Sequence, residues 1–328
     1  MAKAKKKGGP AVVALPTIGI LHSGSEDANR PQIAALMTAI ADAGYIDGEN
    51  VTIPDPLYSN DNATTLATNA ASLVTGAGAV NVIVAAGGTA AAVAAKTANT
   101  NAGTQVPIVF TTVTDPVLSG LVANLNAPGG NLTGTAGLTS ELDPTRLKLL
   151  QEFLPTLGGA SAKVGVLTND SRLKINDQFA ALQAAANGIG LQLERQSATT
   201  PGTIDNAINN FTTAVKAILI TADPMFNSQR KKVVRAVKTK GIPAIYQWRE
   251  QVVSGGLMSY GPTLTSAYRQ AGTYAAQILD GDLPKVMPVL RPETYELVIN
   301  VSTAHKMGFD VPLAMLTRAV ILQHKRKH

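Results

Sequence analysis

The chain has 328 residues, of which 45% are hydrophobic and none is cysteine, and its formal net charge is +6. This length predicts two domains, and the missing cysteines exclude disulfides, thiolate metal sites, a thiol nucleophile and a lipid-modified N-terminal cysteine. The first seven and last four residues hold seven Lys and Arg and no acidic residue, which leaves 21 basic against 22 acidic residues between them. Because the excess charge belongs to the ends, and aromatic residues make up 4% of the chain, we expect no nucleic-acid partner.

Both ends are predicted to lie outside the folded lobes. Residues 1–16 form a disordered basic tail whose lysines are typical of the start of a signal peptide, but the apolar stretch 11–15 is short and closed by Pro10 and Pro16. We interpret it as a trimming or expression scar, or as a start site placed inside the true signal. Residues 321–328 form a second basic tail. No run of 18 apolar residues occurs, so no transmembrane helix is expected.

From residue 17 onward, short apolar runs alternate with longer helical patterns. Strands are predicted at 17–21, 51–53, 80–85 and 107–110, and helices at 31–43, 62–75 and 89–98. This alternation indicates βαβ units around a parallel sheet. A stretch rich in Gly, Pro and Asn at 124–130 then marks a boundary.

The second half repeats the same layout. Strands are predicted at 132–138, 163–167, 191–194, 217–220, 244–246, 257–261 and 296–301, and helices at 178–187, 227–240 and 264–279. The prediction is an α/β protein with two doubly wound parallel-sheet lobes. Ligands of such sheets bind beyond the carboxyl ends of the strands, so we expect a cleft where the two halves face each other.

Sequence signatures of catalysis are largely missing. The four histidines, His22, His305, His324 and His328, do not form a metal-binding helix motif, and the chain has no phosphate loop and no nucleophile elbow. The Gly-Ala-Gly at 76–78 precedes a strand instead of following one, so it fails the dinucleotide-binding pattern. We therefore expect no enzyme activity, no catalytic residue, no metal and no cofactor.

Two groups of residues have the chemistry to bind a charged solute. Gly88 and Thr89 follow a strand and open a helix, so their backbone N–H groups suit a carboxylate or phosphate; the alternative is a tight turn capped by threonine. Polar side chains also gather at two strand ends, where a carboxylate either accepts a ligand ammonium or caps a helix that begins with proline. These residues are Thr112, Thr114 and Asp115 in the first half and Asp223 in the second.

Aromatic residues near the ends of late strands are further candidates. Tyr246 lies two residues before Trp248, which is the one tryptophan of the chain, and Tyr260 ends a later predicted strand. Such rings either stack on a flat ligand or pack at a hinge or interface. The basic run within 230–240 reads as a solvated helix face, with partner docking as the alternative.

Several strings of residues resemble one known family. The chain has Ile-Gly-Ile-Leu-His-Ser-Gly at 18–24, Pro-Ile-Val-Phe at 107–110, Thr-Asp-Pro-Val at 114–117, Pro-Gly-Gly-Asn-Leu-Thr-Gly at 128–134, Gly-Gly-Leu-Met-Ser-Tyr-Gly at 255–261 and Glu-Leu-Val-Ile-Asn at 296–300. In this order, over about residues 17–318, it is similar to the ABC transporter substrate-binding proteins of the tryptophan/tyrosine-type uptake family. That family has the type I periplasmic-binding fold.

The resemblance implies two lobes joined by a three-segment hinge near 132–139, 257–262 and 292–297. Lobe one would then comprise 17–133 plus 262–292, and lobe two 137–258 plus 297–320. The implied site residues are Ser23, Gly88, Thr89, Thr112, Thr114 and Asp115 in lobe one, Asn169, Asp223 and Tyr246 in lobe two, and Tyr260 at a crossing. A bound α-amino acid would place its carboxylate on the amides of Gly88 and Thr89 and its ammonium on Asp223 or Asp115.

The resemblance also implies a role and partners. The protein would be a periplasmic monomer that captures an amino acid or other small organic solute, closes around it and docks on an ABC permease. The chain departs from the family in its incomplete signal peptide and in a basic tail where relatives continue with acidic residues. Two alternatives remain: a two-lobed enzyme such as a group transferase, or a ligand-sensing domain of a regulator, for which the 16 residues before the first strand are too few to form a helix-turn-helix.

Overall fold

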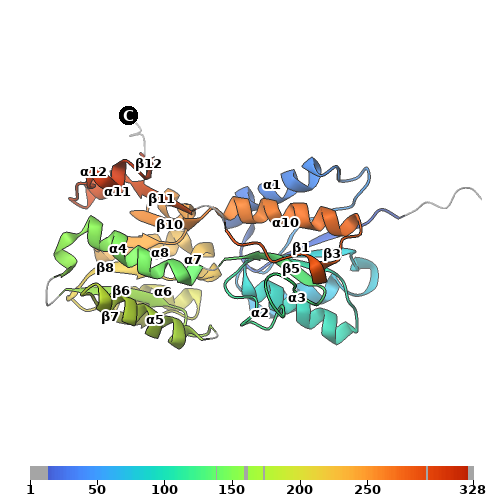
Figure 1. Cartoon of the computed structure of the whole chain (residues 1–328), viewed down its shortest axis with the longest axis horizontal. Helices are drawn as coiled ribbons and strands as arrows, with labels where there is room; N and C mark the ends of the chain where they lie inside the picture. Colours follow the sequence, from blue (N-terminus) through green and yellow to red (C-terminus); the bar gives the residue numbers. More distant parts are fainter. Residues whose placement is uncertain (1–13, 138, 159–161, 173, 293–294, 324–328) are drawn as a thin grey trace, which may run out of the picture.

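Two α/β lobes lie side by side along the long axis of the molecule (Figure 1). The computed structural model describes residues 14–323 except 138, 159–161, 173 and 293–294. Most of the predicted N-terminal tail and the end of the C-terminal one therefore lie outside the described residues. The predicted α/β architecture with two parallel-sheet lobes is confirmed.

Lobe one is built on a five-stranded sheet in which every pair of neighbouring strands is parallel, in the order β2-β1-β3-β4-β5. Its strands are β1 Ile18–His22, β2 Leu57–Tyr58, β3 Val82–Ala86, β4 Ile108–Val113 and β5 Leu132–Ala136. The predicted strand at 51–53 forms isolated bridges only. Pro54 and Pro56 follow it, and a proline has no N–H to extend a ladder, so the edge strand forms later, at β2.

Helices cover both faces of this sheet, which explains why its strands are nearly continuous apolar runs. One face packs against α1 Glu26–Asp42 and α10 Leu264–Leu279, which lie side by side in Figure 1. The other face packs against α2 Ala63–Ser72 and α3 Thr89–Ala102. The buried side of α3 consists mainly of alanines, whose small side chains let the helix lie close to the sheet.

Lobe two is built on a seven-stranded sheet in the order β12-β11-β10-β9-β8-β6-β7. Its strands are β6 Lys163–Thr168, β7 Gln192–Ser197, β8 Val215–Ile220, β9 Ala244–Tyr246, β10 Met258–Pro262, β11 Tyr295–Asn300 and β12 Val320–Leu322. All pairs are parallel except β10 with β11, because β10 takes the chain to lobe one and β11 brings it back. Since β12 pairs with β11, the folded part extends past residue 321, where the C-terminal tail was predicted to begin.

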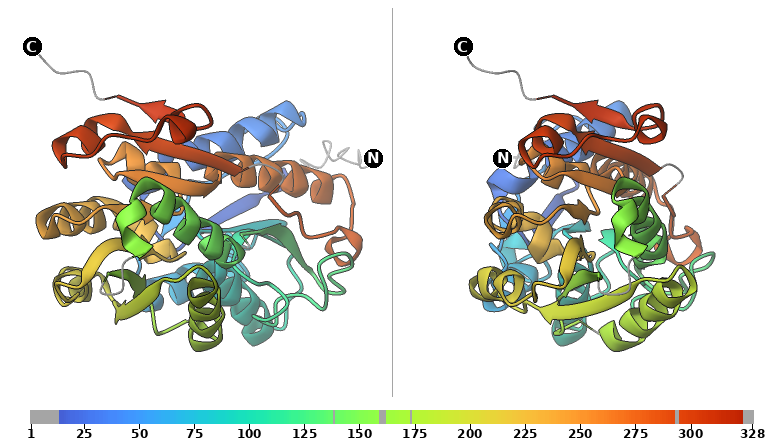
Figure 2. Two further views of the ribbon diagram at one scale, coloured as in Figure 1. Left: turned by 60° about the vertical axis from the view of Figure 1, so that its left-hand side comes forward. Right: turned by 90° about the vertical axis from the view of Figure 1, so that its left-hand side faces the viewer.

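The helices of lobe two also form two layers (Figure 2). One face of the sheet packs against α4 Asp143–Phe153 and α5 Ile175–Gly188, together with α11 Val301–Lys306 and α12 Leu313–Leu316. The other face packs against α6 Ile204–Asn209, α7 Pro224–Ser228 and α8 Arg230–Lys240. The short α9 Arg249–Val253 follows β9.

The chain passes between the lobes three times: from β5 to α4, from β10 to α10, and from residue 290 to β11. A buried ion pair anchors the second passage to lobe two. Arg146 of α4 is fully buried, donates from Nε to the Tyr260 carbonyl at 2.7 Å and pairs through Nη1 with Asp143 Oδ1 at 2.5 Å. The buried guanidinium thus ties α4 to the end of β10, the strand that leads into lobe one.

Candidate ligand-binding site

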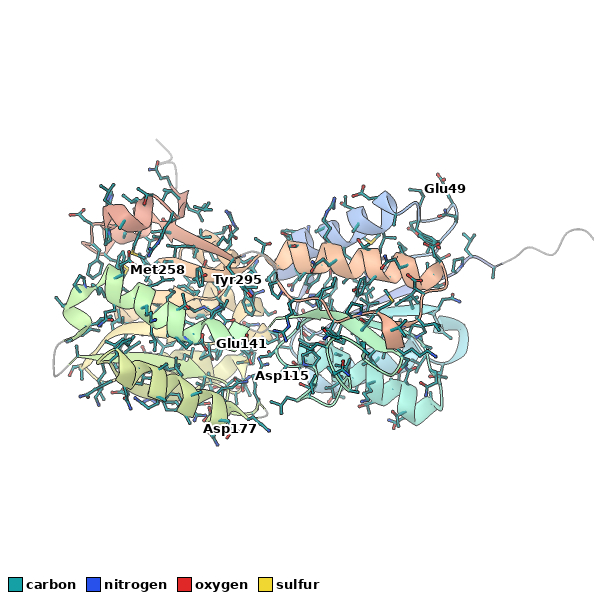
Figure 3. All side chains as sticks on the ribbon, viewed as in Figure 1. Glu49, Asp115, Glu141, Asp177, Met258 and Tyr295 are labelled. Atoms are coloured by element: carbon teal, nitrogen blue, oxygen red, sulfur yellow. The ribbon has the colours of Figure 1, made fainter. Side chains whose placement is uncertain are left out.

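A cavity of about 410 Å³ lies between the lobes. It is lined by loops that follow the carboxyl ends of strands in both sheets, where parallel sheets bind ligands, and its volume is within the range of roughly 300–1,000 Å³ typical of small-molecule sites. Figure 3 shows Asp115 at the boundary where the lobes face each other. Of the ten predicted site residues, the six that line the cavity are Ser23, Thr89, Thr114 and Asp115 from lobe one and Asn169 and Asp223 from lobe two.

Gly88 lies beside the cavity, at the contact between the lobes. Its backbone has φ +89° and ψ −159°, a conformation open almost only to glycine. A Cβ atom at this position would come within 2.8 Å of Pro224 Cγ in lobe two. The glycine therefore lets the start of α3 approach the opposite lobe, and it contributes no side chain to the cavity.

Thr89 opens α3 on the cavity wall. The first N–H groups of a helix have no partner within the helix, and here the N-cap residue is a glycine that offers no side chain to cap them. The hydroxyl oxygen of Thr89 is buried and, within the described part of the chain, has no hydrogen-bond partner. This end of the cavity therefore has unused donors and a positive helix dipole, which suit an anionic group.

Thr112 faces two smaller cavities, of about 30 and 60 Å³, which it shares with Trp248. Its φ of +51° is unusual for a β-branched residue and coincides with an irregular register between β4 and β5. The Thr112 N–H donates to Thr135 Oγ1 at 3.0 Å. These facts place Thr112 outside the lining of the main cavity, near the passages between the lobes.

The two predicted stacking tyrosines do not line the main cavity. Tyr246 is 1% exposed and packs in the core between β8, β9 and α8, because that face of β9 is covered by helix. Tyr260 lies on β10, packs against the core on the opposite face of the lobe-two sheet and stacks at a tilt against Tyr295. Both side chains stabilise lobe two, which corrects the stacking prediction. No aromatic side chain is among the residues that line the cavity in the part of the chain that the structure describes.

Asp223 is the centre of a polar network at the end of β8. Its Oδ1 caps α7 by accepting the Met225 N–H at 2.8 Å, so the capping alternative is confirmed. The capped helix is α7, which lies before the helix start predicted at residue 227. Its Oδ2 accepts from Asn169 Nδ2 at 3.1 Å and from Arg172 Nη1 at 3.3 Å. Arg172 also donates to the Ala222 carbonyl at 2.9 Å and, across the interface, to Thr114 Oγ1 at 2.5 Å.

Sequence reasoning missed Arg172. The signal was present, since Arg172 follows the polar turn at 168–171 that ends β6. Asp115, by contrast, was singled out, and its Oδ1 accepts the Leu118 N–H at 2.9 Å. The residues after Asp115 form turns and not the helix that Asp-Pro suggested.

Asp61 is the second residue that sequence reasoning missed. It follows β2 in a polar run, with φ +61° after Asn60 at φ +51°; Asn and Asp tolerate this left-handed conformation. Its Oδ2 accepts from Gln229 Nε2 of lobe two at 3.3 Å. Burial raises the pKa of the Asp61 carboxyl to about 6; the Asp223 carboxylate adds to the rise, and hydrogen bonds from Gln229 and Ser228 oppose it.

His22 lies at the end of β1, next to Ser23 of the cavity wall. Its Nδ1 accepts the Gly24 N–H at 2.9 Å, and its Nε2 is 2.9 Å from the Tyr268 hydroxyl. Burial lowers the pKa of the imidazole to about 3, so the ring is neutral and its Nε2 carries the proton that it donates to Tyr268. This pair ties the end of β1 to α10.

The lobes are in direct contact around the cavity. Besides the bonds of Arg172 and Asp61, Gln32 of α1 donates to Glu250 Oε1 at 2.9 Å, and the Ser25 N–H donates to Ser228 Oγ at 3.4 Å. These bonds join residues on opposite sides of the cleft, so the arrangement is a closed one.

The described residues hold no group of three or more His, Asp or Glu side chains that could bind a metal ion. In the same part of the chain, no helix has both the length and the apolar composition needed to cross a membrane.

Comparisons with known proteins agree with this geometry. A family model described as ABC transporter substrate binding protein matches residues 17–322. A tyrosine-binding protein of Clostridioides difficile (strain R20291) is 29% identical over 265 residues, which are 81% of this chain and 73% of that protein.

Two solved structures bear on the conformation. An ABC domain from Streptococcus pneumonia in complex with L-Trp is similar with a TM-score of 0.83 and 25% identity, over 94% of this chain and 100% of that one. The ligand-free, open structure of a substrate binding protein from Clostridium difficile has a TM-score of 0.68 at 25% identity, over 95% of this chain and 100% of that one. At the same sequence identity, the structure in complex with L-Trp has a higher TM-score than the ligand-free, open one. This is expected for a chain whose lobes are closed.

Proposed function

The chain belongs to the family of ABC transporter substrate-binding proteins, and from this premise we propose that it captures an α-amino acid with a large apolar side chain in the cavity between its lobes. It releases the solute unchanged to a membrane permease. The observation that carries this proposal is the pairing of unused donors at the start of α3 with several carboxylates on the walls of one closed cavity. A zwitterion satisfies both.

The carboxylate of the solute is proposed to bind at the start of α3. There Thr89 and Ala90 line the cavity, the first N–H groups of the helix have no side-chain cap, and the buried hydroxyl of Thr89 has no hydrogen-bond partner among the described residues. Hydrogen bonds to a charged group are worth about 1.5–3 kcal/mol each, more than those between neutral groups.

The side chain of the solute is proposed to rest on aliphatic walls. Leu66 and Leu118 come from lobe one, and Met225 and Pro201 come from lobe two. The flexible methionine side chain adapts to rings as well as to branched chains. Since the relatives named above include a tyrosine-binding protein and an L-Trp complex, tyrosine and tryptophan are the first solutes to test.

We further propose that the protein acts as a periplasmic monomer whose lobes rotate about the three passages between them. Solute contacts both lobes only in the closed form, so it favours that form by its differential affinity. The hydrogen bonds that now join the lobes, such as Gln32 to Glu250, would break on opening.

Isothermal titration calorimetry and thermal unfolding test the proposal. L-Trp, L-Tyr, L-Phe and L-Leu are compared with glucose and myo-inositol, and Trp248 fluorescence reports closure, since this single tryptophan is buried beside the interface. At least one amino acid is expected to bind and to raise the melting temperature, because it binds the native state alone. Binding of a sugar and of no amino acid would contradict the proposal.

A pair of variants locates the carboxylate. Thr89→Val removes the hydroxyl with little change in shape and is expected to weaken amino-acid binding about tenfold, from the loss of one charge-assisted hydrogen bond. Thr100→Val on the same helix is the control, because the Thr100 hydroxyl donates to the Lys96 carbonyl on the exposed side of α3. Equal effects of the two substitutions would show that the carboxylate binds elsewhere.

A further inference from the structure

The cavity has more carboxylates than cations. Asp61 and Asp115 come from lobe one and Asp223 from lobe two, whereas Arg172 is the one cationic side chain among the described residues that line the cavity. Arg172 is already paired with Asp223 at 3.3 Å. The acidic surplus therefore lies on lobe one, in Asp61 and Asp115.

These two carboxylates differ in what they contact. Asp115 accepts a hydrogen bond from the Leu118 N–H of its own loop, so it serves the local structure of lobe one. Asp61 accepts from Gln229 and Ser228, both of lobe two. Its backbone is also fixed, because the Asp61 N–H donates to the Ser23 carbonyl at 2.8 Å. Asp61 is thus held at the interface between the lobes.

Closure brings like charges together at this point. Burial is the main reason that the Asp61 carboxyl is hard to ionise, and the Asp223 carboxylate of the opposite lobe adds to the effect. Arg172 pairs with Asp223, whereas the partners of Asp61 across the interface, Gln229 and Ser228, offer neutral hydrogen bonds only. A buried carboxylate is costly to ionise when no cation lies beside it. The closed form therefore contains an electrostatic cost on the side of the cavity where Asp61 lies.

We propose that Asp61 recognises the amine of the solute, and that an ammonium bound beside Asp61 supplies the cation that this carboxylate lacks and so holds the lobes closed. This inference rests on the proposed function and names the residue that selects amino acids over carboxylic acids without an amine. It replaces Asp223 and Asp115 as the principal ammonium acceptor. The raised pKa of Asp61 agrees with it, because a carboxyl that is hard to ionise alone gains most from a cationic neighbour.

The test compares two matched pairs of probes by calorimetry: L-Tyr with 3-(4-hydroxyphenyl)propionate, and L-Trp with 3-indolepropionate. Asp61→Asn keeps the left-handed backbone that asparagine tolerates and removes the charge. We expect it to weaken binding of the amino acids at least tenfold and to strengthen binding of the acids without an amine. Asp177→Asn is the control, because it removes one exposed carboxylate of lobe two that does not line the cavity.

The outcomes separate the two proposals. If the wild-type protein binds neither L-Tyr nor L-Trp, the proposed function fails for these solutes and the inference fails with it. If the wild type binds them and Asp61→Asn weakens both members of a pair equally, or Asp115→Asn causes the change in preference instead, the inference alone is overturned.

A second measurement needs no variant. In the wild type, affinity for L-Tyr should fall several-fold as the pH drops from 7.5 to 5.5, because Asp61 takes up a proton near pH 6. Affinity for 3-(4-hydroxyphenyl)propionate should not fall over the same range. Parallel pH profiles for the two probes would contradict the role of Asp61 even if the variant fails to fold.

Discussion

Gly88 offers a direct test of whether the lobes close as the structure shows. Substitution by alanine adds one methyl group, which has two separate effects. The first is on the backbone of lobe one, because φ +89° and ψ −159° lie in a region that costs other residues about 1–3 kcal/mol. This cost applies whether the cleft is open or closed, so it lowers the free energy of unfolding without changing affinity.

The second effect arises only on closure. The new Cβ would lie 2.8 Å from Pro224 Cγ of lobe two, a distance at which one of the two atoms must move. Overpacking of one methyl group typically costs about 1–3 kcal/mol. Because solute binds the closed form, that cost appears as a loss of affinity of roughly 5- to 150-fold.

Calorimetry with L-Tyr or L-Trp, together with thermal unfolding and small-angle scattering, separates the two effects. Gly103→Ala is the control for backbone strain, since Gly103 ends the same helix at φ +65° with nothing within 4 Å of its added Cβ. It should lose stability and keep full affinity. Combining Gly88→Ala with Pro224→Ala removes the clashing Cγ and should restore most of the affinity, with the coupling read from the double-mutant cycle.

One result would refute this reasoning. If Gly88→Ala loses stability as Gly103→Ala does but binds solute as tightly as the wild type, the start of α3 does not meet Pro224 in the bound state. The closed arrangement would then differ from the one described above.

Two further predictions concern stability. Burial lowers the pKa of His22 to about 3, so between pH 6.5 and 3 the unfolded chain takes up a proton that the folded one does not. As the pH is lowered through that window, the free energy of unfolding should fall by about 1.4 kcal/mol per pH unit. Urea unfolding measured at several pH values should show a smaller slope for His22→Asn. Arg146→Met leaves the Asp143 carboxylate buried without its 2.5 Å partner and should lower the free energy of unfolding by about 3–5 kcal/mol. Combining it with Asp143→Leu should recover much of this stability. No recovery in the double variant would show that the bond to Tyr260 matters more than the charge pair.

The family resemblance drawn from the sequence is confirmed by the match over residues 17–322. The strands and their polar ends were predictable because period, apolar runs and turn residues are local properties. The position of Thr89 after β3 and of Asp223 after β8 needed only the rule that parallel strands present their carboxyl ends on one edge. The predicted capping role of Asp223 was local as well.

What the sequence left undetermined depends on contacts between distant segments. Asp61 meets Gln229 across 168 residues, and Arg172 meets Thr114 across 58. Nothing in either local sequence says which polar residue faces the other lobe. Tyr246 was assigned to the cleft because it ends a strand, but helices cover both faces of that sheet and its ring packs inward.

The division of the cavity between the lobes accounts for selective closure. Lobe one supplies donors for a carboxylate at Thr89 and a carboxylate at Asp61, whereas lobe two supplies Asp223 with its partner Arg172. Because Asp61 has only neutral partners across the interface in the closed form, an empty cleft gains less from closing than one that holds an ammonium. A solute that brings a carboxylate but no amine satisfies α3 and leaves Asp61 without a cation. Selection for amino acids would then arise from the closing step as well as from the contacts of the open lobe, which is why affinity for the acids without an amine should rise when Asp61 loses its charge.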